Sequence, residues 1–297
     1  MKSGFVAVLG APNVGKSTFI NAVLSKKVSI VSPKPQTTRE TLDAIYTDKE
    51  CQLVFIDTPG LFDSSEALDA YMNKSARGAI SGADAVVYMV SAAESNTAQD
   101  DKTLSTLKFS CPLFIVINKI DLATAPMMEE KLAHFTSSYP NAKIFQLSAL
   151  TNFGIKDLRD ALKFIMKEGP AYFPEGTITD KDRQFFAKEE IRQELLHFLK
   201  DEAPHQSAVV IDSFREKDGN CKILATIFVE KPSQQAIVIG KGGEMIKRIS
   251  MTARRNLMKE WKERVELLIK VAYEPNWRNK ADKLKAFGYG KQKGAGE

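Results

Sequence analysis

A phosphate-binding pattern lies near the start of the chain, where residues 10–17 read Gly-Ala-Pro-Asn-Val-Gly-Lys-Ser. The spacing of Gly10, Gly15, Lys16 and Ser17 matches G-x-x-x-x-G-K-[ST]. Glycines let the backbone wrap closely around phosphates with its N–H groups pointing inward. Lys16 would then bring positive charge to β- and γ-phosphates, and Ser17 a hydroxyl to Mg²⁺. An apolar run ends at Leu9 and a helix is expected from Ser17, which favours this interpretation over a glycine-rich turn with an exposed lysine.

Two further segments have the chemistry to act on the same phosphates. Residues 57–60 read Asp-Thr-Pro-Gly and follow the apolar run 53–56. Asp57 could hold Mg²⁺ through water, and Gly60 could offer its N–H to a γ-phosphate. Residues 35–39 read Pro-Gln-Thr-Thr-Arg. A threonine there could close on Mg²⁺ in the triphosphate state, and we predict Thr38, with Thr37 as the alternative.

The base would be recognised by two later segments. Residues 118–121 read Asn-Lys-Ile-Asp and follow the apolar run 113–117. Asp121 can accept hydrogen bonds from N1–H and the 2-amino group of guanine, which adenine lacks, and a buried carboxylate left unpaired is costly. Residues 148–150, Ser-Ala-Leu, could place a backbone N–H near the guanine O6.

Each motif alone has a plain alternative, such as a strand-end cap at Asp57 or a polar turn at 118–121. Five motifs in this order, four of them directly after a predicted strand, favour one GTP site, because ligands of open α/β sheets bind at that edge. The predicted catalytic residues are Lys16, Ser17, Thr38, Asp57 and Gly60, with Ser17 and Thr38 on Mg²⁺. The predicted nucleotide-binding residues are Gly10, Ala11, Pro12, Asn13, Val14, Gly15, Lys16, Ser17, Thr18, Asp57, Thr58, Pro59, Gly60, Leu61, Asn118, Lys119, Ile120, Asp121, Ser148, Ala149 and Leu150.

The elements that position these motifs are predicted from short apolar runs separated by helical segments. The runs at 5–9, 53–56, 85–90, 113–117 and 143–147 mostly lack strict alternation, which indicates strands buried on both faces. They predict an α/β domain over residues 1–167, with a mostly parallel sheet and helices on both faces. Residues 43–46 are a candidate edge strand, and 155–167 a closing amphipathic helix. Glycines and prolines between 168 and 177 predict a linker over 168–183.

Residues 184–297 predict a second, α+β domain. A helix at 184–199 is followed by strands at 209–214 and 222–230, helices at 233–239 and 244–261, and a strand at 265–273. Gly240, Lys241, Gly242 and Gly243 form a G-x-x-G loop between the two later helices. Residues 1–170 carry 18 basic and 18 acidic side chains, whereas 171–297 carry 24 and 19, so the second part holds the whole excess of +5.

A G-x-x-G loop beside a basic helix favours RNA over a merely solvated face, since such loops bring backbone close to phosphates. The predicted RNA-binding residues are Gly240, Lys241, Gly242, Gly243, Lys247, Arg248, Arg254 and Arg255. Ile237 and Ile239 line a base-binding groove or belong to the core, and we favour the core for at least one. The basic tail from Trp277 through Lys285 adds RNA contacts, touches anionic lipid, or caps the domain; its sequence leaves all three open.

Together these motifs resemble the Era family of translation-factor-class GTPases, over nearly the whole chain and in domain order. The resemblance rests on residues 10–17, 35–39, 57–60, 118–121 and 148–150, and on 238–247, Val-Ile-Gly-Lys-Gly-Gly-Glu-Met-Ile-Lys. It implies a P-loop GTPase domain joined to a type II KH domain. It also implies GTP, GDP and Mg²⁺ as ligands, and a role in maturing the small ribosomal subunit through its ribosomal RNA near the 3′ end.

Two positions bear on hydrolysis. Leu61 stands where Ras-like proteins carry the glutamine that orients the attacking water, and Era-like proteins also have an apolar residue there. Slow intrinsic turnover is therefore expected. Asn13 matches the asparagine that helps to hold a potassium ion in related GTPases, so K⁺ could supply charge in place of an arginine finger. A side chain that only stabilises the loop is the alternative for Asn13.

Composition excludes several other classes of protein. No apolar stretch approaches 18 residues, and no secretory signal pattern is present. Cys51, Cys111 and Cys221 lack metal-ligand spacing and indicate thiols of a reducing cytosol. We expect a cytoplasmic monomer that binds small-subunit ribosomal RNA. The alternatives are an RNA-binding protein that needs nucleotide only for stability, and a signalling GTPase held peripherally on the inner face of the cell membrane.

Overall fold

The computed structural model describes all residues except 33, 35, 63–65, 95 and 291–297. Pro35 of the predicted Mg²⁺-closing segment and the last seven residues of the predicted second domain therefore lie outside the described residues. The chain forms two compact units: residues 1–64 and 72–180 belong to the first, and residues 65–71, which include the start of α2 (Ala67–Gly78), belong with 181–297 to the second. Each unit has its own sheet and core, and each is described by itself below.

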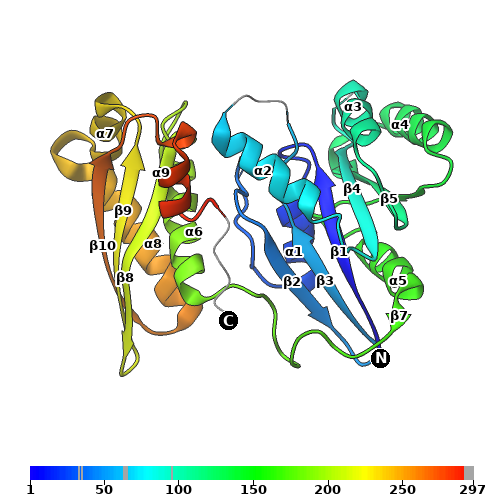
Figure 1. The fold of residues 1–297 in the computed structure, drawn as a ribbon, viewed down its shortest axis with the longest axis horizontal. Coiled ribbons are helices and arrows are strands. Elements are labelled where there is room, and N and C mark those ends of the chain that lie inside the picture. The colour runs from blue at the N-terminus through cyan, green and yellow to red at the C-terminus, as the bar shows by residue number, and fades with distance from the viewer. Residues whose placement is uncertain (33, 35, 63–65, 95, 291–297) are drawn as a thin grey trace. The chain divides into compact units, whose positions relative to one another are not determined.

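The first unit is built on a sheet with the strand order β2-β3-β1-β4-β5-β6 (Figure 1). Strands β3, β1, β4, β5 and β6 run parallel, as predicted, and β2 is an antiparallel edge strand. A short strand, β7, pairs antiparallel with the start of β1. The strand bounds are β1 Lys2–Gly10, β2 Leu42–Thr47, β3 Cys51–Asp57, β4 Ala85–Ser91, β5 Leu113–Asn118, β6 Lys143–Gln146 and β7 Lys167–Glu168.

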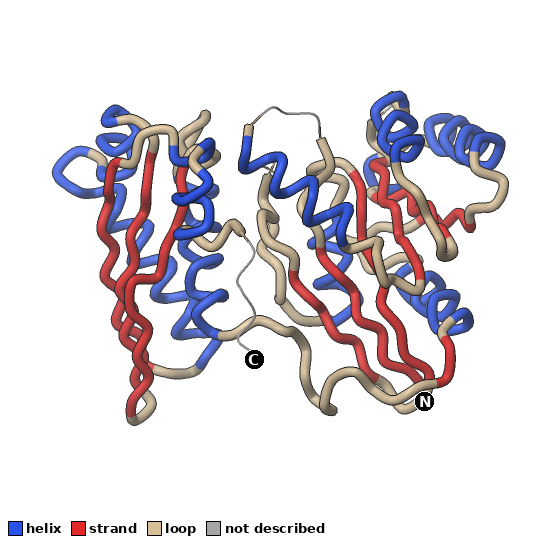
Figure 2. The backbone as a smooth tube through the Cα atoms, in the orientation of Figure 1, coloured by secondary structure: helices blue, strands red, loops and turns tan. Residues whose placement is uncertain are grey.

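Helices cover both faces of this sheet, as the sequence predicts (Figure 2). On one face α1 (Lys16–Leu24) packs with α5 (Ile155–Ile165), and the ring of Phe19 meets that of Phe55 in β3 at 5.8 Å. On the other face α2 (Ala67–Gly78), α3 (Ala98–Thr106) and α4 (Ala125–Ser138) contribute buried side chains to a second core. The predicted closing helix is α5, although it ends at Ile165 and Lys167 begins β7.

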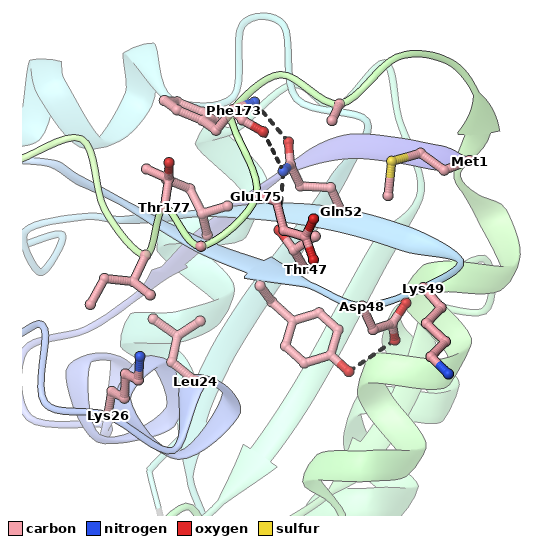
Figure 3. A pocket seen from close by; sticks show the side chains of 15 residues that line it. Met1, Leu24, Lys26, Thr47, Asp48, Lys49, Gln52, Phe173, Glu175 and Thr177 are labelled. Carbon is pink, nitrogen blue, oxygen red and sulfur yellow. Dashed lines mark hydrogen bonds between the residues drawn. The ribbon is translucent and has the colours of Figure 1, made fainter.

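Residues 172–180 of the predicted linker pack on the edge of the first unit. The fully buried side chain of Gln52 in β3 accepts hydrogen bonds from the backbone of Tyr172 and Phe173 and donates one to the Phe173 carbonyl. Ile45 of β2 donates its N–H to the carbonyl of Ile178 over 3.0 Å. A hollow of about 680 Å³ remains between β2 and residues 171–178 (Figure 3). None of the nucleotide-motif residues lines it, so this large cavity is not the predicted site.

The second unit has the order helix, two strands, two helices, strand that we predicted for a type II KH domain. Its elements are α6 Arg183–Phe198, β8 Ser207–Lys217, β9 Asn220–Val229, α7 Pro232–Ile239, α8 Glu244–Trp261 and β10 Arg264–Tyr273. In the sheet β10-β9-β8, strands β8 and β9 are antiparallel and β9 and β10 parallel. Apolar residues of α6 and α8, including Ile191, Leu195 and Ile249, pack against β8 and β9 to form its core.

The basic tail and the residues directly after it cap this second unit. Trp277 is fully buried, and its indole N–H donates to the carbonyl of Gln206 over 3.0 Å. After the short helix α9 (Ala281–Ala286), the ring of Phe287 stacks on Phe228 of β9 at 4.4 Å. Capping, one of the three uses left open for the tail, is therefore shown by direct contacts. Among the helices that the structure describes, none is long and apolar enough to cross a membrane.

Candidate nucleotide site and nucleic-acid interface

The phosphate loop joins β1 to α1 and depends on two glycines. Gly10 and Gly15 have φ angles of +141° and +100°, which side chains rarely adopt. A Cβ atom on Gly10 would lie 2.2 Å from the carbonyl oxygen of Met89, and one on Gly15 would lie 2.2 Å from Nδ2 of Asn118. Neither position therefore accepts another residue without displacing the neighbouring strand ends.

Lys16 begins α1 and folds back over the loop. Its Nζ donates hydrogen bonds to the carbonyls of Gly10 (3.0 Å) and Ala11 (2.8 Å), and the residue is 6% exposed. Burial lowers the pKa of Lys16 to about 8, against the opposing charges of Asp57 and Asp100. A buried cation without a full counter-charge is suited to an anionic ligand such as a phosphate group.

The predicted Mg²⁺ residues meet at the other end of the loop. The hydroxyls of Ser17 and Thr38 share a hydrogen bond of 2.9 Å, and Ser17 Oγ donates to Oδ2 of Asp57 over 3.0 Å. Thr37, the alternative, instead donates to the carbonyl of Lys34 over 2.6 Å. Of the two threonines, the structure therefore brings Thr38 to Ser17.

Asp57 ends β3 and is fully buried. Burial raises the pKa of its carboxyl group, while the hydrogen bond from Ser29 and the charge of Lys16 oppose that shift. Its Oδ1 atom accepts no hydrogen bond of normal geometry from the described residues. A buried carboxylate oxygen with no donor, beside two hydroxyls, is a donor set of the kind that fits hydrated Mg²⁺.

The two base-recognition segments are fastened to each other and to the phosphate loop by Asn118. Its Nδ2 donates to the carbonyl of Val14 over 2.8 Å, and its Oδ1 accepts the backbone N–H of Ala149 over 3.0 Å. Ser148 and Ala149 are buried, whereas Leu150 is 75% exposed. Asp121, in a short 3₁₀ turn after β5, is exposed. The Asp121 carboxylate can therefore be buried only when a bound base covers it.

A cavity of about 430 Å³ lies over the phosphate loop. Its walls come from the loop, from residues 30–32 and 36–38, from Gly60 and from Lys119; the lining residues are Pro12, Asn13, Gly15, Lys16, Ser17, Thr18, Ile30, Val31, Ser32, Gln36, Thr37, Thr38, Gly60 and Lys119. Leu61 is absent from this lining, because its side chain is 3% exposed in the core beneath the sheet. Thr58 also turns inward and donates to the carbonyl of Val8 over 2.6 Å.

Two residues next to the site were not identified from the sequence. Ser29 donates its hydroxyl to Asp57, and Asn21 of α1 binds the backbone of Val28 and Ser29. Asn21 had one detectable signal, an amide side chain within a helix whose neighbours Phe19, Ile20 and Val23 are buried apolar residues. Ser29 lies in a stretch without a motif and had none.

The G-x-x-G loop lies between α7 and α8, as predicted. Gly242 has a φ angle of +60°, and a Cβ atom there would meet no other atom within 4 Å. The loop backbone is therefore open on this side. On α7 the core residue is Val238; Ile237 is 51% exposed and Ile239 is half-buried outside that core cluster. Our preference for the core at one of these two isoleucines is wrong, because the helix turns Val238 inward.

The four predicted RNA-binding residues of α8 are all exposed. Lys247, Arg248 and Arg255 line a hollow of about 410 Å³ together with Glu244, Met251 and Thr252. The guanidinium group of Arg248 lies over the ring of Phe198 in α6, at 4.5 Å. Arg254 is not in this lining, although it lies seven positions after Lys247 and therefore points within about 20° of it. The predicted RNA-binding residues of α8 thus lie next to one another on the exposed side of the helix.

A phosphate loop, a strand-end carboxylate and an Asn-Lys-x-Asp segment at one edge of a parallel sheet, followed by a KH fold, define a GTPase with an appended nucleic-acid-binding domain. Family models agree: one described as 50S ribosome-binding GTPase matches residues 5–119, and one described as KH domain matches residues 202–278. The chain belongs to the Era family of GTPases. It is 38% identical to GTPase Era of Lacticaseibacillus paracasei over 97% of this chain and 96% of the relative.

Two solved structures are similar over nearly the whole chain. One is Era in complex with MgGDPNP and nucleotides 1506–1542 of 16S ribosomal RNA, with a TM-score of 0.93 and 31% identity. The other is a point variant of Aquifex aeolicus Era bound to GDP·AlF4⁻, with the same TM-score and identity. Each comparison covers 97% of this chain and 99% of the relative. The GTPase-plus-KH architecture predicted from the sequence is thereby confirmed.

Proposed function

We propose that this GTPase is a GTP-timed assembly factor that binds small-subunit ribosomal RNA near its 3′ end during maturation of the small ribosomal subunit. The observation that carries the proposal is the occurrence, on one chain, of the Ser17–Thr38–Asp57 cluster and an open G-x-x-G loop. A relative that is similar over both units was crystallised with MgGDPNP and a 16S ribosomal RNA fragment.

In this proposal Lys16 and the loop N–H groups hold the β- and γ-phosphates, and Gly60 presents its N–H to the γ-phosphate. Ser17, Thr38 and, through water, Asp57 would hold Mg²⁺, which neutralises charge that develops on the phosphates. Asp121 would accept hydrogen bonds from guanine, and a backbone N–H of residues 148–150 would lie near the guanine O6. GTP and GDP are thus the ligands, and hydrolysis changes the contacts available to Thr38.

Leu61 takes no direct part in hydrolysis, because its side chain is buried in the core. Intrinsic turnover should therefore be slow. Asn13 lines the cavity in a left-handed conformation, with φ of +61°. We propose that it helps to hold a potassium ion beside the phosphates, where a fixed positive charge stabilises the transition state.

The second unit would bind single-stranded ribosomal RNA through its loop and α8. Gly240, Lys241, Gly242 and Gly243 would face the RNA backbone, and Lys247, Arg248, Arg254 and Arg255 would add phosphate contacts. A lipid surface is the competing use of these cations. Co-sedimentation with anionic liposomes in competition with RNA separates the two.

The linker gives a physical route from nucleotide state to the second unit. Thr38 lies four residues before β2, and Leu42, the first residue of β2, is the register partner of Asp57 in β3. The outer edge of β2 is bonded to the linker: Asp43 N donates to Asp180 Oδ1 over 2.8 Å, and Ile45 N to the Ile178 carbonyl. A change at Thr38 would therefore reach the linker through one strand.

A multiple-turnover phosphate-release assay tests the enzymatic half of this proposal. Release should require Mg²⁺, prefer GTP over ATP, be lost in Lys16→Ala, and slow when Na⁺ replaces K⁺. Absence of GTP turnover would instead support a nucleotide-stabilised RNA-binding protein. Equal rates in K⁺ and Na⁺ would remove the role of Asn13 alone.

A further inference from the structure

A three-residue chain of hydrogen bonds leads from α1 to the Asp57 carboxylate. The amide of Asn21 clamps the segment that follows α1: its Oδ1 accepts the N–H groups of Val28 (2.8 Å) and Ser29 (3.0 Å), and its Nδ2 donates to the Ser29 carbonyl (2.8 Å). The hydroxyl of Ser29 then donates to Oδ2 of Asp57 over 2.7 Å. Ser29 is 8% exposed, so this bond is shielded from water.

Both donors to Asp57 converge on the same oxygen. Ser29 and Ser17 each donate to Oδ2, whereas Oδ1 has no donor of normal geometry among the described residues. Two bonds to one oxygen, one of them from a hydroxyl whose backbone is itself clamped, fix the rotation of the carboxylate. Oδ1 is then the oxygen left for a hydrated cation.

Ser29 also marks one end of the segment that lines the nucleotide cavity. Ile30, Val31 and Ser32 follow it directly, and Thr38 at the other end bonds Ser17. Thr38 and Ser17 are the residues proposed to bind Mg²⁺, so their mutual bond must be exchanged when the ion binds. The bond between Ser29 and Asp57 involves neither, which makes it the fixed anchor of the segment.

We infer that Ser29 is a positioning residue for Mg²⁺: it orients the Asp57 carboxylate so that Oδ1 faces the hydrated ion. This inference rests on the proposed role of Asp57. Hydrogen bonds to metal-binding groups typically contribute about 10- to 100-fold to metal affinity. Because Ser29 is one of two donors to Oδ2, we expect an effect near the lower limit, about 10-fold.

The test is Mg²⁺ titration of the full-length protein loaded with mant-GDP, with nucleotide release as the readout. Ser29→Ala should need about 10-fold more Mg²⁺ for half-maximal slowing of release. In excess EDTA its release rate should equal that of the unchanged protein. Ser29→Cys is close in volume to serine but a weak donor, so it should shift in the same direction if the alanine variant folds poorly.

Ser3→Ala is the matched control. Ser3 is 6% exposed and its hydroxyl donates to the carbonyl of Pro170 over 2.8 Å, so the variant loses a similar buried bond far along the chain from Asp57. It should leave the Mg²⁺ titration unchanged. A Ser29 variant with the unchanged Mg²⁺ midpoint, or with release accelerated equally in EDTA, would overturn the inference. Release that is insensitive to Mg²⁺ in the unchanged protein would overturn the proposed Mg²⁺ site as well.

Discussion

Asn118 donates its side-chain amide to the carbonyl of Val14 over 2.8 Å, so the end of β5 is bonded to the middle of the phosphate loop. The same side chain accepts the N–H of Ala149 after β6. One buried amide thus joins three segments that would contact phosphate and base. Both bonds are to the backbone, which keeps the segments in place before any nucleotide binds.

Replacing Asn118 should therefore destabilise the protein itself. Asn118→Ala would leave the carbonyl of Val14 and the N–H of Ala149 buried without partners, each costing about 1–3 kcal/mol. We expect the free energy of unfolding of the nucleotide-free protein to fall by about 2–4 kcal/mol, measured by urea unfolding followed by circular dichroism. A variant as stable as the unchanged protein would show that these bonds are not maintained in solution.

Replacing Asp121 should change the selectivity for the nucleotide base but not the free energy of unfolding, because its side chain is exposed. Asp121→Asn replaces an acceptor with a group that can donate to the 2-oxygen of xanthine, so preference should move from GTP towards XTP. Competition binding against mant-GTP gives the ratio directly. If the unchanged protein binds ATP as tightly as GTP, the guanine assignment is wrong.

The buried charge of Lys16 should lower the free energy of unfolding of the protein when no nucleotide is bound. Its pKa is lowered by burial to about 8, from an ordinary value of 10.5. The unfolded chain therefore binds more protons between these values, and stability rises as the pH increases from about 8 towards 10. Lys16→Met removes the buried charge but leaves two carbonyls without their donor, so we expect a net gain of only about 1 kcal/mol at pH 7.

That gain should shrink as the pH rises above 8. In the folded unchanged protein Lys16 is then largely neutral, so burying it destabilises the protein less. Urea unfolding at pH 7 and at pH 9.5 measures both values. The same variant should lose GTP binding. A Lys16→Met protein that is less stable than the unchanged one at pH 7 would contradict the electrostatic interpretation of this site.

Much of this site was predictable because each motif determines the backbone conformation of a short segment. Gly15 must be glycine beside Asn118, and Asp57 must end a strand; both constraints are written into short stretches of sequence. Ser29 was not predictable, since its role comes from a bond to a residue 28 positions away. For the same reason the packing of the linker was not predicted: the contacts of Gln52 with residues 172–173 depend on the finished sheet edge.

Helix geometry limited the prediction in the second unit in a different way. Counting basic residues along α8 identified its charge but not which residues line a common hollow: Arg255 lines it together with Lys247 and Arg248, whereas Arg254 does not. The role of the tail could not be predicted because its many lysines outnumber the few apolar residues that pack against the domain. Trp277 and Phe287 are buried, and they account for its packing.

Gly242 supplies the sharpest test of the RNA face. Gly242→Asp adds a side chain and a negative charge where phosphate should approach, so RNA binding should fall by at least about 100-fold, with GTP hydrolysis in the absence of RNA unchanged. Gly219, in the turn between β8 and β9, is a matched control, since it also has a positive φ (+72°) and open space around a Cβ atom. Gly219→Asp should keep RNA affinity, measured by fluorescence anisotropy, within about 2-fold. Equal losses in the two variants would point to backbone strain instead of a phosphate contact.

The central claim is that nucleotide state controls RNA binding, and one titration tests it. Affinity for a fluorescent single-stranded RNA with the sequence of the small-subunit ribosomal RNA 3′ end should be measured with the protein saturated by Mg²⁺ and either GDPNP or GDP. We predict tighter binding with GDPNP by about 5- to 100-fold, the range of typical coupling between two sites, and a reciprocal preference of the RNA complex for GDPNP. Equal RNA affinity in the two states would contradict the account and leave a GTPase and an RNA-binding domain without a switch between them.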